Sequence, residues 1–150
     1  MTDYEYNREN NHSLSNFQKL PKEPEEEYEK EKRITPQFIK KILRSDIKLY
    51  YCTPELNETL YLHYKGFVAI ENLDDFTELK VLYIEGNCIS KLQGLSAFKK
   101  LRCLYIQENL IKKIEGLESN QFLLTLNLSD NFIETFENIS HLKELETIQI

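Results

Sequence analysis

The side chains that could do chemistry are few and scattered along this chain of 150 residues. The three histidines, His12, His63 and His141, lie far apart, and no serine and aspartate accompany one of them as a catalytic triad would require. His63 and Cys103 come nearest to a metal pair, but two ligands do not complete a zinc site. The four glycines stand singly at positions typical of turns, so no phosphate-binding loop is present. We therefore expect no catalytic residue, no metal and no cofactor.

Composition and charge narrow the class of partner. The net charge is −6, and no strongly basic stretch is present, which argues against binding of nucleic acid. The polar N-terminus and the absence of a long apolar run predict neither a signal peptide nor a membrane span. The three cysteines are widely spaced and odd in number, which suits free thiols in a reducing compartment. We expect an intracellular protein with no nucleic-acid, membrane or small-molecule partner.

Two segments 22 residues apart are nearly the same: LKVLYIEGNCISKLQGL at 79–95 and LRCLYIQENLIKKIEGL at 101–117. The same spacing aligns four full repeats and the start of a fifth. Apolar residues recur in the columns Leu79/Leu101/Leu123/Leu145, Leu60/Leu82/Leu104/Leu126/Ile148, Leu62/Ile84/Ile106/Leu128/Ile150, Phe67/Ile89/Ile111/Ile133, Ile70/Leu92/Ile114/Phe136 and Leu73/Leu95/Leu117/Ile139. The pattern L-x-x-L-x-L-x-x-N-x-I-x-x-L-x-x-L is that of a short leucine-rich repeat.

The periodicity inside each repeat predicts its local structure. The L-x-L part alternates with a period of two, which indicates a short strand whose leucines point inward. One such strand cannot bury its inner face alone, but stacking on the next repeat builds a continuous sheet and core. We therefore predict an α/β fold, a right-handed leucine-rich-repeat solenoid with a parallel sheet on its concave face.

Two polar columns fit the same register. Asn87, Asn109 and Asn131 stand where the chain leaves each strand, and we expect their amides to bond unpaired backbone groups as a structural ladder. A second column, just before the last apolar position, holds only asparagine and glycine. These residues tolerate positive φ best, so we expect a left-handed turn once per repeat at Asn72, Gly94, Gly116 and Asn138.

The N-terminal part departs from the repeat. Thr35-Pro36 is typical of a helix start, and the apolar residues that follow fall on one helical stripe, so residues 35–56 are predicted to form a helical cap. Residues 1–34 contain PKEPEEEYEKEKR and lack apolar periodicity, which predicts a disordered acidic tail.

Residues 57–150 are assigned to the repeats. The chain stops at Ile150, on the inward column of a fifth strand, with nothing that caps the core. Because solenoids normally carry caps at both ends, we expect this chain to be the N-terminal portion of a longer protein.

The outward residues of the predicted strands form the candidate functional surface. Its central column is Tyr61, Tyr83 and Tyr105, followed by Asn127, and its polar flank is His63, Glu85 and Gln107. Aromatic anchors with polar surroundings are typical of protein interfaces. The alternative is that tyrosine merely favours strands. Stacked bases of a single-stranded nucleic acid are disfavoured because no basic groove accompanies the tyrosines.

One longer stretch resembles a known family more specifically. TPELNETLYLHYKGFVAIENLDDFTELKVLYIEGN at 53–87, followed by LRCLYIQENLIKKIEGLE at 101–118, is similar to the leucine-rich-repeat axonemal dynein assembly factors. KLYYCTPELN resembles that family's N-terminal cap, and the likeness covers roughly residues 35–150. Its most specific part lies outside the repeat consensus, at His63, Tyr64, Lys65 and Gly66.

The resemblance implies a cytoplasmic factor that preassembles dynein arms with chaperones before their transport into cilia or flagella. Its implied partners are axonemal dynein chains and chaperone or assembly factors, and the family offers no catalytic residues to carry over. The same repeat class occurs in the nuclear phosphatase regulator related to yeast suppressor of dis2 and in the spliceosomal leucine-rich A-prime protein. A phosphatase regulatory subunit and a splicing ribonucleoprotein adaptor therefore remain alternative functions.

Overall fold

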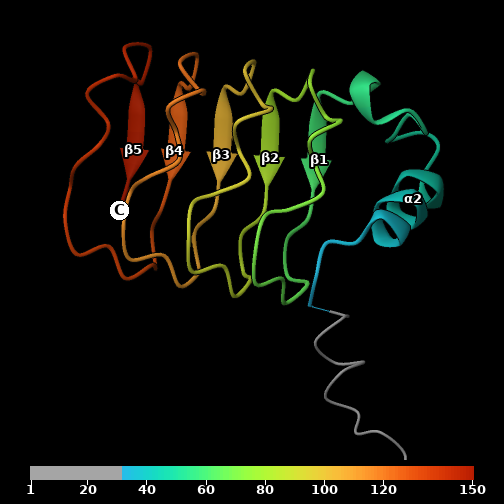
Figure 1. Cartoon of the computed structure of the whole chain (residues 1–150), viewed down its shortest axis with the longest axis horizontal. Coiled ribbons are helices and arrows are strands. Elements are labelled where there is room, and N and C mark those ends of the chain that lie inside the picture. The colour runs from blue at the N-terminus through green and yellow to red at the C-terminus, as the bar shows by residue number, and fades with distance from the viewer. Residues whose placement is uncertain (1–31) are drawn as a thin grey trace, which may run out of the picture.

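The computed structural model describes residues 32–150 and contains one parallel sheet with strand order β1-β2-β3-β4-β5 (Figure 1). The strands are β1 (Thr59–Tyr61), β2 (Val81–Tyr83), β3 (Cys103–Tyr105), β4 (Thr125–Asn127) and β5 (Thr147–Gln149). Each strand pairs in the register of the sequence repeat, so that Leu60 opposes Leu82 and Leu82 opposes Leu104. The leucine-rich-repeat solenoid predicted from the sequence is confirmed.

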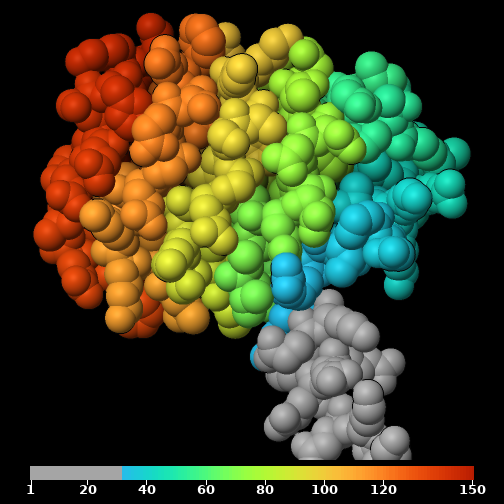
Figure 2. Space-filling view, viewed as in Figure 1, coloured from blue at the N-terminus to red at the C-terminus, as the bar shows by residue number. Residues whose placement is uncertain are grey.

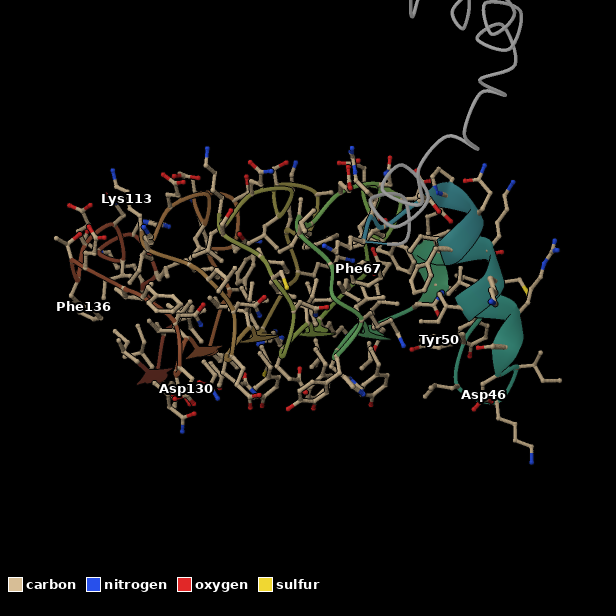
Figure 3. The ribbon with its side chains drawn as sticks, turned by 90° about the horizontal axis from the view of Figure 1, so that it is seen from below. Asp46, Tyr50, Phe67, Lys113, Asp130 and Phe136 are labelled. Carbon is tan, nitrogen blue, oxygen red and sulfur yellow. The ribbon has the colours of Figure 1, made fainter. Side chains whose placement is uncertain are left out.

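The core lies between the sheet and the segments that return from one strand to the next. The inward column is fully buried from Leu60 to Leu126, as the alternation within each strand requires. Phe67 lies inside, between these two sides of the solenoid (Figure 3). In the space-filling view the repeats appear as adjacent bands along the long axis (Figure 2). Each band therefore covers the apolar faces of its neighbours.

A further buried column was not predicted. Phe76, Phe98, Asn120 and Leu142 follow the same spacing, and all four are buried. At Asn120 an amide replaces the ring, and its nitrogen donates to the carbonyl oxygens of Leu95 at 3.0 Å and Phe98 at 2.9 Å. The amide is thus tied to the backbone of the preceding repeat.

A helical cap covers the N-terminal end of the sheet. Helix α2 (Pro36–Ser45) begins after Thr35, whose side-chain oxygen accepts a hydrogen bond from the Phe38 N–H at 3.1 Å. Ile39 and Leu43 are buried, as the predicted apolar stripe requires. The short 3-10 helix η1 (Pro54–Leu56) leads from the cap into β1.

Three contacts attach the cap to the first repeat. The Phe38 ring meets Phe67 edge-on with centroids 5.1 Å apart. The Tyr50 hydroxyl accepts a hydrogen bond from the Tyr61 N–H at 3.3 Å, which satisfies a donor on the open edge of β1. Asn57, which stands where later repeats have leucine, is buried and bonds the backbone of the turn before it, including the Tyr51 N–H at 2.9 Å.

Residues 1–31, which hold most of the predicted tail, lie outside the described residues. Residues 32–34 were assigned to the same tail, but they pack against the first repeat. Ile34 is fully buried, the Val68 N–H donates to the Lys32 carbonyl at 3.1 Å, and Arg33 pairs with Glu71. The folded unit therefore includes residues before Thr35, because Ile34 is buried and both Lys32 and Arg33 bond the first repeat.

The last repeat is only partly covered. Phe136 and Ile150 stand in columns predicted to point inward, yet 58% and 57% of their surfaces are exposed. Ile148 on β5 is half-buried. The reason is physical: a repeat is covered by the repeat that follows it, and within residues 32–150 none stacks on β5.

The asparagine column links neighbouring repeats through the backbone. Asn109 Oδ1 accepts from the Ile89 N–H at 2.9 Å, while its amide nitrogen donates to the carbonyls of Ile84 and Ile106, both at 3.1 Å. Asn87 and Asn131 make equivalent bonds one repeat earlier and one repeat later. Each amide thus satisfies backbone groups of its own turn and of the turn before it.

The predicted left-handed column is confirmed. Asn72, Gly94, Gly116 and Asn138 all have φ between +57° and +72°. A Cβ atom on Gly94 would lie 2.2 Å from the Ile70 carbonyl oxygen, so the preceding turn leaves no room for a side chain there. Asn138 instead donates its amide to the Ile114 carbonyl at 2.8 Å, the corresponding atom two repeats later.

No helix within residues 32–150 is long and apolar enough to cross a membrane.

The substitution Gly94→Ala tests the close approach of neighbouring turns. Gly66→Ala is its matched control, because Gly66 also has positive φ (+76°) but an added Cβ would meet nothing within 4 Å. The backbone strain alone should lower the free energy of unfolding by about 1–2 kcal/mol in the control. Gly94→Ala should cost about 1–3 kcal/mol more, since the Ile70 backbone must move. Urea unfolding followed by circular dichroism measures both, and equal losses would contradict the close packing.

The substitution Asn109→Ala tests the asparagine column. It should lower the free energy of unfolding by at least about 2 kcal/mol, because each buried backbone group left without a partner costs about 1–3 kcal/mol. Asn127→Ala is the control, since its half-buried side chain bonds only the Ser129 N–H among the described residues. The same urea titration should show a loss below about 1 kcal/mol for the control. An equally small loss of unfolding free energy for Asn109→Ala would show that water replaces the hydrogen bonds of the asparagine column.

Candidate protein-binding face

The outward face of the sheet is built by strands that all share one alternation. In β1 to β4 the middle residue is buried and the two flanking residues are half-buried, so the flanking side chains point away from the core. Because the strands are paired without any shift, each outward position repeats as a straight row across the sheet. Neighbouring members of a row are about 4.8 Å apart.

The central row is a stack of three tyrosine rings. Tyr61 and Tyr83 have ring centroids 4.9 Å apart and an interplanar angle of 11°. Tyr83 and Tyr105 are 4.7 Å apart at 9°. These spacings match the distance between strands, so the sheet register itself sets the stacking. We call Tyr61, Tyr83 and Tyr105 the tyrosine stack.

The stack ends where the row changes residue type. Asn127 pairs with Tyr105 in the sheet, but its side-chain oxygen accepts from the Ser129 N–H at 3.1 Å. Within residues 32–150 no fourth ring stacks on Tyr105 on this side. Beside the stack, the His63 ring of the same repeat meets Tyr61 edge-on with centroids 6.1 Å apart. The tyrosine stack therefore ends at a short amide on its β4 side and contacts a histidine beside Tyr61.

A second row, His63, Glu85 and Gln107, runs beside the tyrosine stack. One atom of each side chain, His63 Nδ1, Glu85 Oε2 and Gln107 Oε1, is buried and has no hydrogen-bond partner within residues 32–150. We call these three residues the unpaired row. The structure thus places all the outward residues predicted from the sequence on one face, with Asn127 at its β4 side.

Tyr64 adds an aromatic ring that the sequence analysis did not assign to the face. Its φ is +52°, in the left-handed region that bulky side chains rarely adopt. The ring lies over Gly86, where a Cβ would be 2.1 Å from a Tyr64 ring carbon. Its hydroxyl donates to the Glu108 carboxylate at 3.3 Å, two repeats away. The strained backbone therefore lays this ring along the rim of the face.

The signal for this arrangement was present in the sequence spacing. Tyr64, Gly86, Glu108 and Asp130 stand 22 residues apart, and all four have positive φ. Only one of them is glycine, so a search for glycine and asparagine columns does not find the row. Figure 3 shows Asp130 on the side of the outward side chains and Lys113 on the opposite side. This row forms an acidic rim next to the unpaired row.

The environment of the face raises the pKa of its tyrosines. Burial raises the pKa of the Tyr83 and Tyr105 hydroxyls above the usual 10.0, with smaller contributions from nearby groups that include Cys103. The negative charge of Glu108 raises the pKa of Tyr64, followed by its desolvation. The hydroxyls therefore stay protonated at neutral pH and are available as donors.

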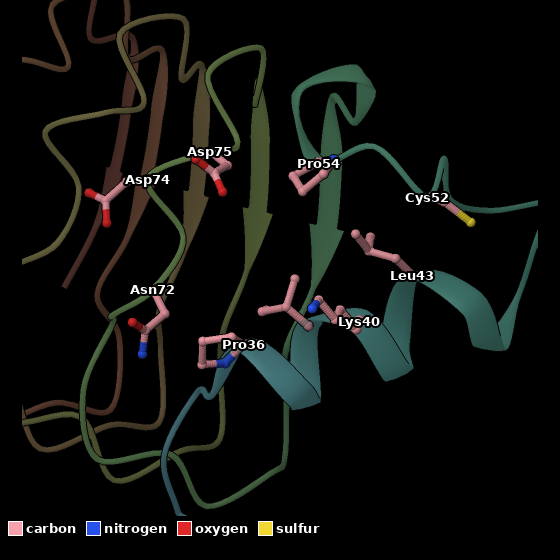
Figure 4. Close-up of a pocket in the computed structure, with 9 residues that line it drawn as sticks. Pro36, Lys40, Leu43, Cys52, Pro54, Asn72, Asp74 and Asp75 are labelled. Carbon is pink, nitrogen blue, oxygen red and sulfur yellow. The ribbon is translucent and has the colours of Figure 1, made fainter.

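A separate pocket of about 440 Å³ lies between α2 and the first repeat (Figure 4). Its apolar wall comes from Ile39 and Leu43, and Asp74 and Asp75 stand on the side of the repeat. Cys52 lines the pocket from the cap. None of the outward residues predicted from the sequence lines it, so it is distinct from the tyrosine stack and the unpaired row.

The remaining candidates for chemistry do not come together. His12 lies outside the described residues. His141 Nε2 lies 3.0 Å from the carbonyl oxygen of Leu117, which belongs to the preceding repeat. Cys52, Cys88 and Cys103 are free thiols. Residues 32–150 contain no group of three or more His, Cys, Asp or Glu side chains placed to hold a metal. The outward face can therefore contact another molecule through aromatic rings, tyrosine hydroxyl groups and hydrogen-bond acceptors.

The substitution Tyr83→Ala tests whether the tyrosine stack is a physical unit. Tyr83 touches a ring on both sides, whereas Tyr105 stacks on one ring only. Since each aromatic pair contributes about 0.5–1.5 kcal/mol, Tyr83→Ala should lower the free energy of unfolding by about that amount more than Tyr105→Ala. Urea unfolding measures the difference. Equal and negligible effects would mean that the rings lie side by side without stabilising each other.

Comparison with known proteins identifies the repeats. The family model described as "Leucine Rich repeats (2 copies)" matches residues 77–119. A Dynein axonemal assembly factor 1 homolog of Drosophila erecta is 54% identical over 59 residues, which is 39% of this chain and 4% of that protein. Dynein axonemal assembly factor 1 of Rattus norvegicus is 52% identical over 52 residues, 35% of this chain and 8% of that protein. The matched segments are therefore a small part of these relatives.

Solved structures of other proteins share the fold. An internalin (inlF) of Listeria monocytogenes has a TM-score of 0.65 at 23% identity and covers 76% of this chain and 34% of its own. Internalin C2 of the same organism has a TM-score of 0.58 at 29% identity over 61% of this chain and 41% of its own. The Drosophila melanogaster SNF/U2A′ complex gives 0.54 at 22% identity, with 65% and 62% covered. The chain therefore has a leucine-rich-repeat fold, and its repeats are similar to segments of dynein axonemal assembly factor 1.

Proposed function

We propose that this chain is part of a non-catalytic protein-binding scaffold for the preassembly of axonemal dynein arms in the cytoplasm. Two kinds of observation support the proposal. The relatives that it matches at 52–54% identity carry the name dynein axonemal assembly factor 1. The fold is a repeat solenoid, an architecture whose extended concave surface is used for binding.

The observation that carries the proposal is the tyrosine stack beside the unpaired row. Rings of this size give large contact areas at a small entropic cost, and tyrosine is enriched in binding hot spots. The polar atoms of the unpaired row have no hydrogen-bond partner within residues 32–150, so a bound molecule can supply hydrogen bonds to these side chains. Tyr61, Tyr83 and Tyr105 are the anchors in this proposal, with His63, Glu85, Gln107 and Asn127 as polar contacts.

The partners that follow are axonemal dynein chains and the chaperones or assembly factors that handle them. The site of action is the cytoplasm, and the product serves the assembly and motility of cilia or flagella. The likeness to the SNF/U2A′ complex is at 22% identity and concerns the fold alone, so it lends no support to a splicing adaptor. No observation on the described residues favours a phosphatase regulatory subunit.

Affinity capture from the cytosol of ciliating cells tests the proposal. The bait is the full chain, compared with Tyr61/Tyr83/Tyr105→Ala, and bound proteins are identified by mass spectrometry. Dynein chains and chaperones should be recovered with the native face and reduced about tenfold or more with the variant, because several hot-spot rings are lost together. The variant should remain folded, since these rings lie outside the core.

A matched control removes apolar side chains elsewhere. Leu110, Phe122 and Phe132 are exposed and lie outside the strands, so Leu110/Phe122/Phe132→Ala deletes comparable surface without touching the face. This control should retain the captured partners. Recovery of phosphatase or splicing components in place of dynein chains would contradict the proposed role. Loss of capture in the control alone would place binding on another surface.

A further inference from the structure

The unpaired row is an unusual concentration of unsatisfied polar atoms. Four buried side-chain atoms within residues 32–150 have no hydrogen-bond partner, and three of them lie in this row. Buried polar groups are otherwise bonded in the great majority of cases, as the asparagine column of this chain illustrates. Within residues 32–150 these three atoms therefore lack a protein hydrogen-bond partner. A partner that supplies the missing groups regains the free energy lost by burying them.

The unsatisfied atoms define the chemistry of that partner. Glu85 Oε2 and Gln107 Oε1 are acceptors, and they lie on neighbouring repeats. A complementary group must therefore donate hydrogen bonds. It must also donate at least two, because the two acceptors come from different strands, about 4.8 Å apart.

Charge around the row favours a cation. Glu85 carries a negative charge within the row, and Glu108 and Asp130 stand exposed along the adjacent rim. No lysine or arginine occupies an outward position of β1 to β5 or a position of the unpaired row. Lys80, which precedes β2, is already paired with Glu58 at 2.6 Å. The outward strand positions and the unpaired row therefore supply no cation to the acceptors that gather there.

We propose that the unpaired row recognises an arginine side chain of the partner protein, with the guanidinium donating to the Glu85 carboxylate and the Gln107 amide oxygen. The proposal rests on the proposed protein-binding function and names the chemical group that the face selects. Guanidinium offers five donors in a planar fork that can serve two acceptors together, whereas the compact ammonium of lysine offers three donors without this fork. The neighbouring tyrosine stack provides the aromatic wall against which arginine packs well.

Titration with short peptides tests the choice of arginine. The probes are acetyl-Gly-Gly-Arg-Gly-Gly-amide and the same peptide with citrulline or lysine at the centre, added to the isotope-labelled full chain and followed by NMR. The arginine peptide should cause saturable shifts at Glu85, Gln107 and the tyrosine stack. Citrulline keeps the shape but removes the charge, so its dissociation constant should be about tenfold weaker. The proposal would be overturned if the citrulline or the lysine peptide bound as tightly as the arginine peptide. It would also be overturned if the arginine peptide caused no saturable shift.

Two substitutions test whether Glu85 and Gln107 form the arginine-binding site. Glu85→Gln removes the charge in the row and should weaken arginine binding about tenfold, whereas Gln107→Glu adds a carboxylate and should strengthen it. Glu118→Gln is the matched control, since Glu118 is exposed and lies in a turn outside the sheet. Its affinity should equal that of the unmodified chain. If Gln107→Glu fails to strengthen binding while its spectrum shows a native fold, the assignment of the acceptor pair is wrong.

The outcomes separate this inference from the proposed function. If dynein chains are captured through the tyrosine stack but the arginine peptide does not bind, the choice of arginine is wrong and the scaffold role stands. If the arginine peptide binds with the stated dependence on Glu85 but no dynein chain is captured, the recognition chemistry stands and the role in dynein assembly is wrong.

Discussion

The structure depends on one constraint: a strand of three residues can neither pair its backbone nor bury its inner face without the next repeat. The Leu62 N–H donates to Tyr83 O and the Ile84 N–H to Tyr105 O, so every repeat completes its neighbour. The asparagine column extends the same dependence beyond the strands, because Asn109 bonds its own turn and the preceding one. Stability is therefore shared along the solenoid, and the covering is weakest where no repeat follows, at Phe136 and Ile150.

The same constraint creates the binding face. Because the register never shifts, a residue type that recurs every 22 positions becomes a continuous row on the outside of the sheet. The rings of Tyr61, Tyr83 and Tyr105 therefore stack at the spacing of the strands, and the register of the sheet accounts for this stacking. The row beside them obeys the same rule but leaves Glu85 and Gln107 with unpaired atoms. Core and face therefore follow from one repeat, and only the outward residue types distinguish one such protein from another.

Much of this could be predicted from the sequence, because burial and strand pairing follow the period directly. The inward columns up to Leu128, the Thr35 cap and the left-handed turns at Gly94 and Gly116 are as expected. Other features depend on contacts between unlike residues, which periodicity does not encode. The left-handed Tyr64 over Gly86 is one, and the buried Asn120 in a phenylalanine column is another. The pairing state of Glu85 and Gln107 likewise requires coordinates, since sequence reveals their position but not their partners.

Site-specific photocrosslinking tests the central claim, that partners bind on the tyrosine stack, most directly. A benzophenone amino acid would replace Tyr83 in one sample and Phe122, an exposed ring outside the strands, in another. After irradiation in the cytosol of ciliating cells, crosslinked proteins would be identified by mass spectrometry. The account predicts that dynein chains or their assembly factors are joined at position 83 and not at position 122. Crosslinks at position 122 alone would contradict it.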